Sequence, residues 1–455
     1  MPEFVYKALK VFTVIRPGEG STVFLLGLNI FLILTAYSIL KPVRTALILT
    51  GQSAEIETYL YGAMAILFVF LIKIFSFLSS KVPRQMLITC VTLFFISNLI
   101  IFYFLHLIGT PIKVLSVIFY IWVGMYNYLL VAQFWGFAND LYTEEAGKRL
   151  FPMIVIGQNS GGLAGSLITA FLVRPLGAYQ MMLVTGGILG ICVGLTFVIH
   201  RREIKIGKSK GAKVTTENES RKKEQEKPLE KGGGFRLVFK SRYLLYIALL
   251  IMILNLVNTT GEYIRKDVFD HAADEALKET PAAEIEVAKT QFLAELEAEF
   301  NSIVNILALL IQLFLVSRIF KWFGVRGALL FLPFIALGGY FFMAFGVSLV
   351  VVRWAKALEN STDYSLMNTV RGALFLNTSR QEKYKAKAAI DTFFVRSGDV
   401  LTGIIVFLGT TYFAFNAERF AKFNVVAAVI WIILCFLIIR EHKRLSEKRT
   451  EYQVE

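Results

Sequence analysis

Apolar stretches of roughly 20 residues alternate with short polar stretches along most of this chain. In the first half they predict membrane-spanning helices at 21–45, 56–79, 85–108, 112–138, 150–173 and 178–199. In the second half they predict helices at 242–266, 301–322, 326–344, 348–374, 387–412 and 424–440. Because about 20 helical residues cross ~30 Å of hydrocarbon, the pattern indicates an all-α membrane protein with about 12 transmembrane helices in two six-helix lobes.

The segments outside these helices give an expected domain organisation. Residues 1–20 carry apolar side chains at helical spacing, which is typical of an amphipathic helix on the membrane surface. Within the polar connection, 206–233 is rich in Lys, Glu, Ser and Gly and is expected to be disordered. The full expected order is surface helix 1–20, lobe 21–200, basic cytoplasmic linker 201–241, lobe 242–440 with an acidic extracytoplasmic segment 267–299, and tail 441–455.

Composition excludes a soluble globular protein, because 56% of the residues are hydrophobic and the mean hydropathy is +0.59. The net charge of +14 is confined to alternate loops, which is the positive-inside pattern and predicts cytoplasmic termini and a cytoplasmic central loop. We therefore expect contact with membrane lipid and no nucleic-acid binding. The basic groups are Lys81/Arg84, Lys148/Arg149, 201–242, Arg318/Lys321/Arg326, Arg380–Lys387 and Arg440–Arg449.

Catalytic and metal-binding signatures are missing from the sequence. There is no Gly-rich phosphate loop, no His-Glu-x-x-His and no closely spaced cysteine pair. Cys90, Cys192 and Cys435 each fall inside an apolar segment, so we expect buried small residues without a disulfide, a metal or a cofactor. The sequence favours a non-enzyme.

An internal repeat relates the two halves. A shift of 238 places Phe137 on Phe375, Asn139 on Asn377, Glu144 on Glu382, Arg149 on Lys387, Leu163 on Leu401 and Gly165 on Gly403. Both stretches follow the fourth helix of their half. The same shift aligns Asn159 with Ser397 and Gly161 with Asp399.

The tenth expected helix contains the densest set of polar residues: Arg353, Lys356, Glu359, Asn360, Asp363 and Arg371. Steps of three and four place Lys356, Glu359, Asn360 and Asp363 on one side of the helix. A charge at the bilayer centre costs about 2.5–3.5 kcal/mol on insertion scales, so this side should face inward. It lines either a central pathway or an internal ladder of ion pairs.

Three other helices carry polar residues of interest. The first ends with Lys41 and Arg44, and Arg44 either offers a donor fork to phosphate or carboxylate or snorkels to the outer surface. The seventh carries Glu262, a position suited to ion pairing or protonation. The eleventh carries Arg396 and Asp399 one turn apart, either as a local pair or as half of a substrate site.

Three stretches resemble one known family. They are Ser-Ile-Leu-Lys-Pro-Val-Arg-Thr-Ala-Leu at 38–47, the Phe-Trp-Gly-Phe-Ala-Asn-Asp stretch within 134–152, and Tyr-Ser-Leu-Met-Asn at 364–368 followed by Lys-Ala-Lys-Ala-Ala-Ile-Asp within 380–391. Together they are similar to the ATP/ADP translocases of obligate intracellular bacteria and plastids and their free-living bacterial relatives. The resemblance implies a major facilitator-like fold, alternating access and a monomer in a bacterial inner membrane.

The resemblance also implies adenine-nucleotide exchange, ATP against ADP, with Lys41, Arg44 and Arg396 meeting phosphates. Asn159 and Asn360 would join this substrate site, and Glu262, Asp363 and Asp399 would tune or gate it. This chain has Arg44 and Arg396 where the family pattern has lysine, and Asp399 where it has glycine. That carboxylate would oppose a phosphate.

An alternative follows from the same buried carboxylates. Glu262, Glu359 or Asp399 could take up and release a proton, which is typical of a proton-coupled carrier of another organic or phosphorylated solute.

Overall fold

The computed structural model describes residues 20–81, 84–141, 144–209, 234–375, 378 and 386–454. The expected surface helix at 1–20 and the expected disorder at 206–233 lie almost wholly outside these residues. The described chain folds into two compact units, considered separately below. Unit 1 comprises Met1–Gln52, Ile66–Pro228 and Thr280–Ser302, and unit 2 comprises Ser53–Ala65, Leu229–Glu279 and Ile303–Glu455.

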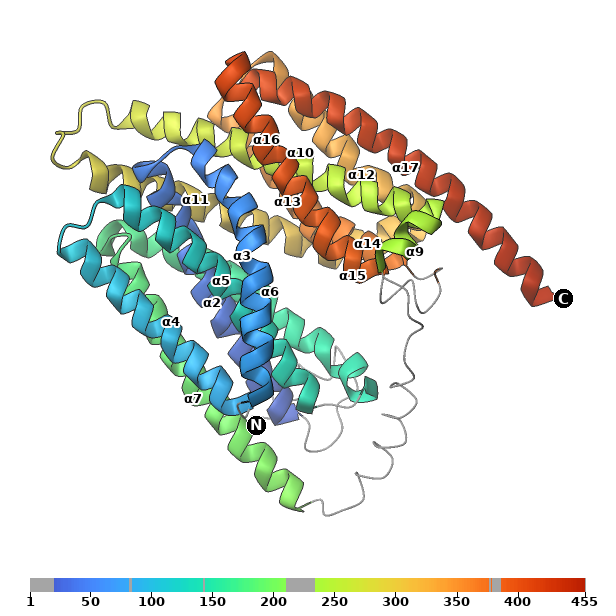
Figure 1. Cartoon of the computed structure of the whole chain (residues 1–455), viewed down its shortest axis with the longest axis horizontal. Coiled ribbons are helices and arrows are strands. Elements are labelled where there is room, and N and C mark those ends of the chain that lie inside the picture. The colour runs from blue at the N-terminus through green and yellow to red at the C-terminus, as the bar shows by residue number, and fades with distance from the viewer. Residues whose placement is uncertain are drawn as a thin grey trace. The chain divides into compact units, whose positions relative to one another are not determined.

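The first half of the chain forms six long helices (Figure 1). They are α2 (Gly20–Gly51), α3 (Ala54–Lys81), α4 (Arg84–Leu107), α5 (Ile112–Leu141), α6 (Glu144–Leu176) and α7 (Gln180–Ser209). In unit 1, α2 packs against α5, α6 and α7, and α4 packs against α5 and α7. The apolar face of α2 is accordingly buried along most of its length, and the helix continues through Pro42.

Glycines bring α2 and α6 into close contact. A Cβ atom at Gly157, Gly161 or Gly165 would lie 2.2–2.3 Å from a carbonyl oxygen of α2. These glycines recur every four residues, so they occupy one face of α6 and allow the two backbones to approach.

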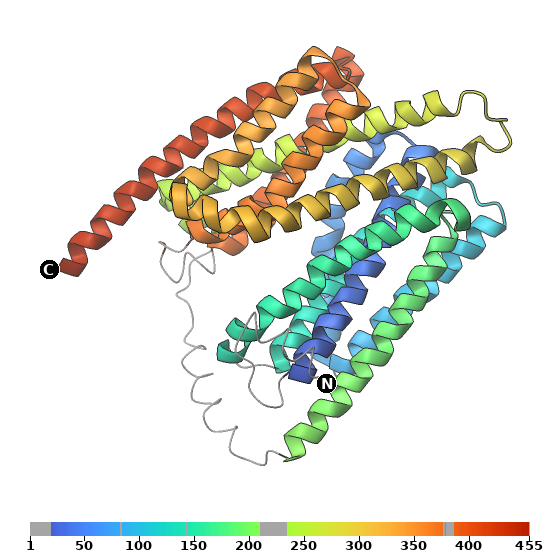
Figure 2. The same cartoon turned by 180° about the vertical axis from the view of Figure 1, so that it is seen from behind.

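The second half contains the remaining helices (Figure 2). They are α9 (Gly234–Lys240), α10 (Arg242–Ala276), α11 (Ile285–Leu310), η1 (Ile311–Leu315), α12 (Val316–Phe345), α13 (Leu349–Thr362), η2 (Asp363–Met367), α14 (Asn368–Leu374), α15 (Lys387–Ala389), η4 (Ile390–Phe394), α16 (Val395–Phe413) and α17 (Ala417–Val454). In unit 2, α10 packs against α13, α16 and α17, and α12 packs against α13 and α17.

The boundary expected between the eighth and ninth helices falls at Gly324. Its φ of 62° and ψ of −177° interrupt the helical backbone inside α12. A positive φ is strained for residues that carry a Cβ atom, and glycine adopts it readily. The expected gap between 322 and 326 is confirmed.

The acidic segment is more helical than expected. The eighth helix does extend outward, since α11 begins at Ile285, but the expected end of the seventh helix at 266 is wrong, because α10 continues to Ala276. Phe269 and Ala273 are fully buried and extend the packed face of α10 beyond its membrane-spanning part. Likewise, α17 runs to Val454, well past the expected end at 440.

Seven described segments are long and apolar enough to cross a membrane, the longest being Ile285–Phe345. The 14-residue α13 is too short to qualify, and it carries the charged residues Arg353, Lys356 and Glu359. Cys192 and Cys435 are buried as expected, whereas the expectation for Cys90 is wrong, because that thiol is exposed on α4. An apolar segment has a lipid-facing side as well as a packed one, and hydropathy does not distinguish them.

Candidate functional site

Charged side chains of α10 and α13 form a buried cluster within unit 2. The Nζ of Lys356 lies 3.0 Å from an oxygen of Glu359 and 3.7 Å from one of Glu262. The other Glu262 oxygen accepts hydrogen bonds from Arg265 at 2.9 and 3.1 Å. Asn360 donates to Glu262 at 2.8 Å. Two carboxylates and two cations therefore neutralise each other inside this unit.

Burial decides between the two readings of the charged helix. The side chain of Lys356 is 0% exposed and that of Glu359 is 5% exposed, whereas Glu262 retains 19%. The structure therefore places Lys356 and Glu359 in an internal network of ion pairs. Of the four residues expected on one side of the helix, Lys356, Glu359 and Asn360 belong to this cluster. Asp363 is half-buried and begins η2, where Arg371 and Lys356 are its main charged neighbours.

Two residues of this cluster were not identified from the sequence. Tyr340, on α12, donates its hydroxyl hydrogen bond to Glu359 at 2.7 Å and lies 3.2 Å from the carbonyl oxygen of Val257. Gly261 makes room for this hydroxyl, since a Cβ atom there would lie 1.9 Å from the Tyr340 oxygen and 2.9 Å from Nζ of Lys356. The chain has 18 tyrosines, and nothing in the sequence around Tyr340 indicates that this one contacts a charged residue.

A second buried ion pair joins α10 to the first part of α3, also within unit 2. The Nζ of Lys266 lies 2.6 Å from a carboxylate oxygen of Glu57, and their side chains are 5% and 0% exposed. Tyr61 lies 3.1 Å from the same ammonium group. Glu55, two residues before Glu57, does not take part in this ion pair. The sequence offers two nearby glutamates and does not indicate which of them pairs with Lys266.

Arg396 and Asp399 form the local pair that was one of the two expectations for the eleventh helix. Their side chains lie 3.2 Å apart on α16 and are 41% and 10% exposed. Asp399 also accepts a hydrogen bond from Thr259 of α10 at 3.0 Å. The aligned position in the first half behaves similarly, because Thr35 of α2 donates to the carbonyl oxygen of Gly161 at 3.2 Å.

Unit 1 contains the other expected site residues. Arg44 is 6% exposed, and its guanidinium lies 4.3 Å from the ring centre of Tyr120 on α5. Since the side chain is held in the packed interior of the unit, the alternative of snorkelling to the outer surface is wrong. Lys41 is half-buried and donates to Asn301 at 2.7 Å. Asn159 is exposed on α6.

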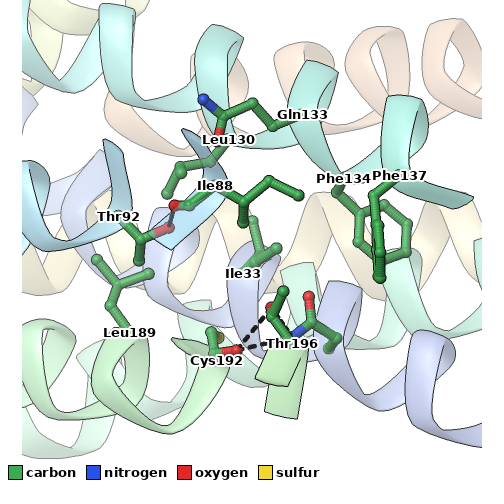
Figure 3. A pocket seen from close by; sticks show the side chains of 11 residues that line it. Ile33, Ile88, Thr92, Leu130, Gln133, Phe134, Phe137, Leu189, Cys192 and Thr196 are labelled. Carbon is green, nitrogen blue, oxygen red and sulfur yellow. Dashed lines mark hydrogen bonds between the residues drawn. The ribbon is translucent and has the colours of Figure 1, made fainter. Parts of the chain in front are cut away.

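Unit 1 also encloses a small cavity among α2, α4, α5 and α7 (Figure 3). Its lining includes Asn29, Thr92, Gln133 and Thr196 among apolar side chains. The volume of about 20 Å³ accommodates one water-sized molecule, so it is not a site for a solute. No group of His, Cys, Asp or Glu side chains suited to a metal occurs among the described residues.

Comparison with known proteins places the chain among membrane transporters. A model of the Major Facilitator Superfamily matches residues 20–378. The ADP,ATP carrier protein 2 of Chlamydia pneumoniae is 21% identical over 484 residues, which cover 89% of this chain and 86% of that carrier. The ADP,ATP carrier protein 1 of the same organism is 24% identical over 334 residues, which cover 64% of this chain and 61% of that carrier. A mutant of the nucleoside transporter NupG has the same fold, with a TM-score of 0.63 at 12% identity over 92% of this chain and 99% of that chain.

Proposed function

Because this chain belongs to the Major Facilitator Superfamily, a family of integral membrane transporters, we propose that it exchanges adenine nucleotides, ATP against ADP, by alternating access. The observation that carries the proposal is the similarity to an ADP,ATP carrier along 89% of this chain. The expected motifs of such carriers recur in the same order, at 38–47, 134–152 and 364–391.

Lys41, Arg44 and Arg396 supply the cations that a polyphosphate needs. The guanidinium of Arg44 packs over the ring of Tyr120. This contact orients the N–H donors of Arg44 inside a poorly hydrated interior. Arg396 is the more accessible of the two arginines, with 41% of its side chain exposed. Charge-assisted hydrogen bonds from such groups recognise phosphate oxygens.

The distribution of basic loops supports a cytoplasmic location for both termini in a bacterial inner membrane. In that orientation, the acidic segment 267–299, which includes the ends of α10 and α11, is extracytoplasmic.

Reconstituted exchange tests the proposal. Liposomes loaded with ADP should take up labelled ATP, and empty liposomes should not. Arg44→Ala and Arg396→Ala should each reduce this uptake at least tenfold, since each removes a phosphate contact worth about 1.4 kcal/mol or more. Arg444→Ala, at an arginine whose side chain is 63% exposed on α17, is the matched control and should transport normally. Uptake that does not depend on internal nucleotide would overturn the exchange mechanism.

A second candidate function has its own supporting observation. The charge-balanced cluster of Glu262, Arg265, Lys356 and Glu359 is suited to binding a proton, which favours proton-coupled transport of another organic or phosphorylated solute. The same liposomes distinguish the two, because uptake by this carrier would not depend on internal ADP.

A further inference from the structure

The Tyr340 hydroxyl lies between two acceptors, and this arrangement has a specific chemical consequence. One acceptor is a carboxylate oxygen of Glu359 at 2.7 Å, and the other is the carbonyl oxygen of Val257 at 3.2 Å. A phenol has a single hydrogen to donate, and its oxygen can accept one in return. Tyr340 can therefore form a hydrogen bond with the ionised form of Glu359, as donor, and with the protonated form, as acceptor.

We infer that Glu359 is a reversible proton-binding site of the transport cycle and that Tyr340 is its positioning residue. In the ionised state, Tyr340 donates to Glu359. When a proton from water binds the same carboxylate oxygen, the new O–H donates to Tyr340, whose own hydrogen turns to the carbonyl of Val257. No covalent bond other than the O–H bond forms or breaks, and the Lys356 ammonium stays protonated.

The surroundings of Glu359 are arranged for this exchange. Its neighbours are Lys356 on α13, Tyr340 on α12 and, on α10, Glu262, which Arg265 and Lys266 face. Lys356 keeps other partners when Glu359 is neutral, because its Nζ lies 2.9 Å from the amide oxygen of Asn258 and 3.7 Å from Glu262. Lys266 is already paired with Glu57, and Asp363 interacts with Lys356 from about two turns further along the chain.

The carbonyl of Val257 already lies within hydrogen-bond distance of the Tyr340 hydroxyl, at 3.2 Å. It also accepts a hydrogen bond from the side-chain amide of Asn424 on α17 at 3.1 Å, besides the backbone N–H that its place inside α10 gives it. Gly261 keeps the space open, since any Cβ atom there would collide with the Tyr340 hydroxyl. The Tyr340 hydroxyl and the Glu359 oxygen that faces it therefore keep a hydrogen-bond partner in either state.

Protonation changes the charge of the cluster. With Glu262 and Glu359 ionised, their two negative charges balance the positive charges of Lys356 and Arg265. When Glu359 is neutral, the same four residues carry one excess positive charge beside the partly exposed Glu262. An excess cation in a poorly solvated site attracts an anion strongly. Proton binding should therefore favour binding of an anionic solute, and only this coupling rests on the proposed function.

Infrared spectroscopy of the purified full-length protein tests proton binding without any solute. The C=O stretching band of a buried protonated carboxyl group, at higher frequency than the band of the exposed carboxyl groups, should appear as the pH falls, and Glu359→Gln should remove it. Tyr340→Phe should keep the band but move its midpoint by about one unit to higher pH, because a charge-assisted hydrogen bond to the ionised form is lost.

Tyr243→Phe is the matched control. Tyr243 is 2% exposed in the same unit, and its hydroxyl donates to the backbone carbonyl of Leu374 at 2.8 Å. This substitution should leave the midpoint unchanged. A band that persists in Glu359→Gln, or equal shifts in the two phenylalanine variants, would overturn the inference. A titrating band in a protein that does not exchange nucleotides would instead overturn the proposed function alone.

Discussion

The ammonium group of Lys356 lies 3.0 Å from the carboxylate of Glu359, one helical turn away, and both side chains are buried. Such a pair costs several kcal/mol in desolvation per ion, so its geometry must be supported by further hydrogen bonds. Tyr340 donates one to Glu359, and Lys356 donates one to the amide oxygen of Asn258. The stability of unit 2 therefore depends on charge balance within this network.

Lys356→Met should destabilise the protein strongly. The substitution keeps an unbranched side chain but leaves Glu359 and Glu262 without their shared cation, and breaking a buried pair costs about 3–5 kcal/mol. The midpoint of thermal unfolding in detergent should fall accordingly. Lys278→Met is the control, because the Lys278–Glu275 pair is 71% and 80% exposed and should be worth less than about 1 kcal/mol.

Charge neutralisation should rescue this variant. Adding Glu359→Gln to Lys356→Met removes an uncompensated buried carboxylate, so the double variant should be more stable than the single one. If Lys356→Met and Lys278→Met have the same midpoint of thermal unfolding, the pair of Lys356 and Glu359 contributes nothing to stability.

The sequence predicted the positions of the long helices, but it predicted neither the ends of α10 and α17 nor the partners of the polar residues. Lengths of apolar runs placed the helices, and basic residues flanking Gly324 marked the break between two of them. Helical spacing placed Lys356, Glu359 and Asn360 on one face. That Lys356 and Asn360 contact Glu262, about 100 residues earlier, depends on the packing of α10 against α13, which local pattern does not encode.

The uncharged residues that hold the charged cluster in place were not predicted. Tyr340 and Gly261 differ in no local property from other tyrosines and glycines of apolar helices, and their roles arise from one hydrogen bond and one missing methyl group. Charge inside an apolar segment is costly and therefore conspicuous, whereas a hydroxyl or a glycine is not. Arg44 and Asp399 could be predicted as site residues because each is a charged residue within an apolar segment.

Asp399→Asn should strengthen the binding of a nucleotide. Asparagine keeps the volume and the hydrogen bond from Thr259 but removes the negative charge beside Arg396. The concentration of ADP that half-saturates uptake should fall about tenfold, since removing a nearby like charge is worth about 1.4 kcal/mol at partial exposure. Weaker binding would show that the carboxylate contacts the solute favourably.

Gly161→Ala should disrupt the packing of α2 against α6. Its methyl group would lie 2.2 Å from the carbonyl oxygen of Phe31, so the helices must separate at a cost of about 1–3 kcal/mol. Gly187→Ala is the control, because that glycine lies exposed on α7 with no atom within 4 Å of the added carbon. Thermal unfolding should separate the two variants, and equal midpoints would refute the close contact.

A disulfide between α2 and α11 should arrest transport. The hydroxyl oxygens of Thr50 and Thr290 lie 3.1 Å apart within unit 1, so these positions are candidates for a cross-link between the two helices. Residues Thr280–Ser302 of the α11 region belong to unit 1, whereas the continuation of that helix belongs to unit 2. Since alternating access moves one six-helix half against the other, the outer part of α11 must leave α2 during the cycle.

The variant Thr50→Cys/Thr290→Cys would be made with Cys90, Cys192 and Cys435 replaced by alanine, so that one disulfide alone can form. Oxidation should abolish uptake into proteoliposomes, and a reductant should restore it. Thr50→Cys by itself should transport normally under both conditions. Full transport by a protein shown to be completely cross-linked would mean that α2 and the outer part of α11 move as one body.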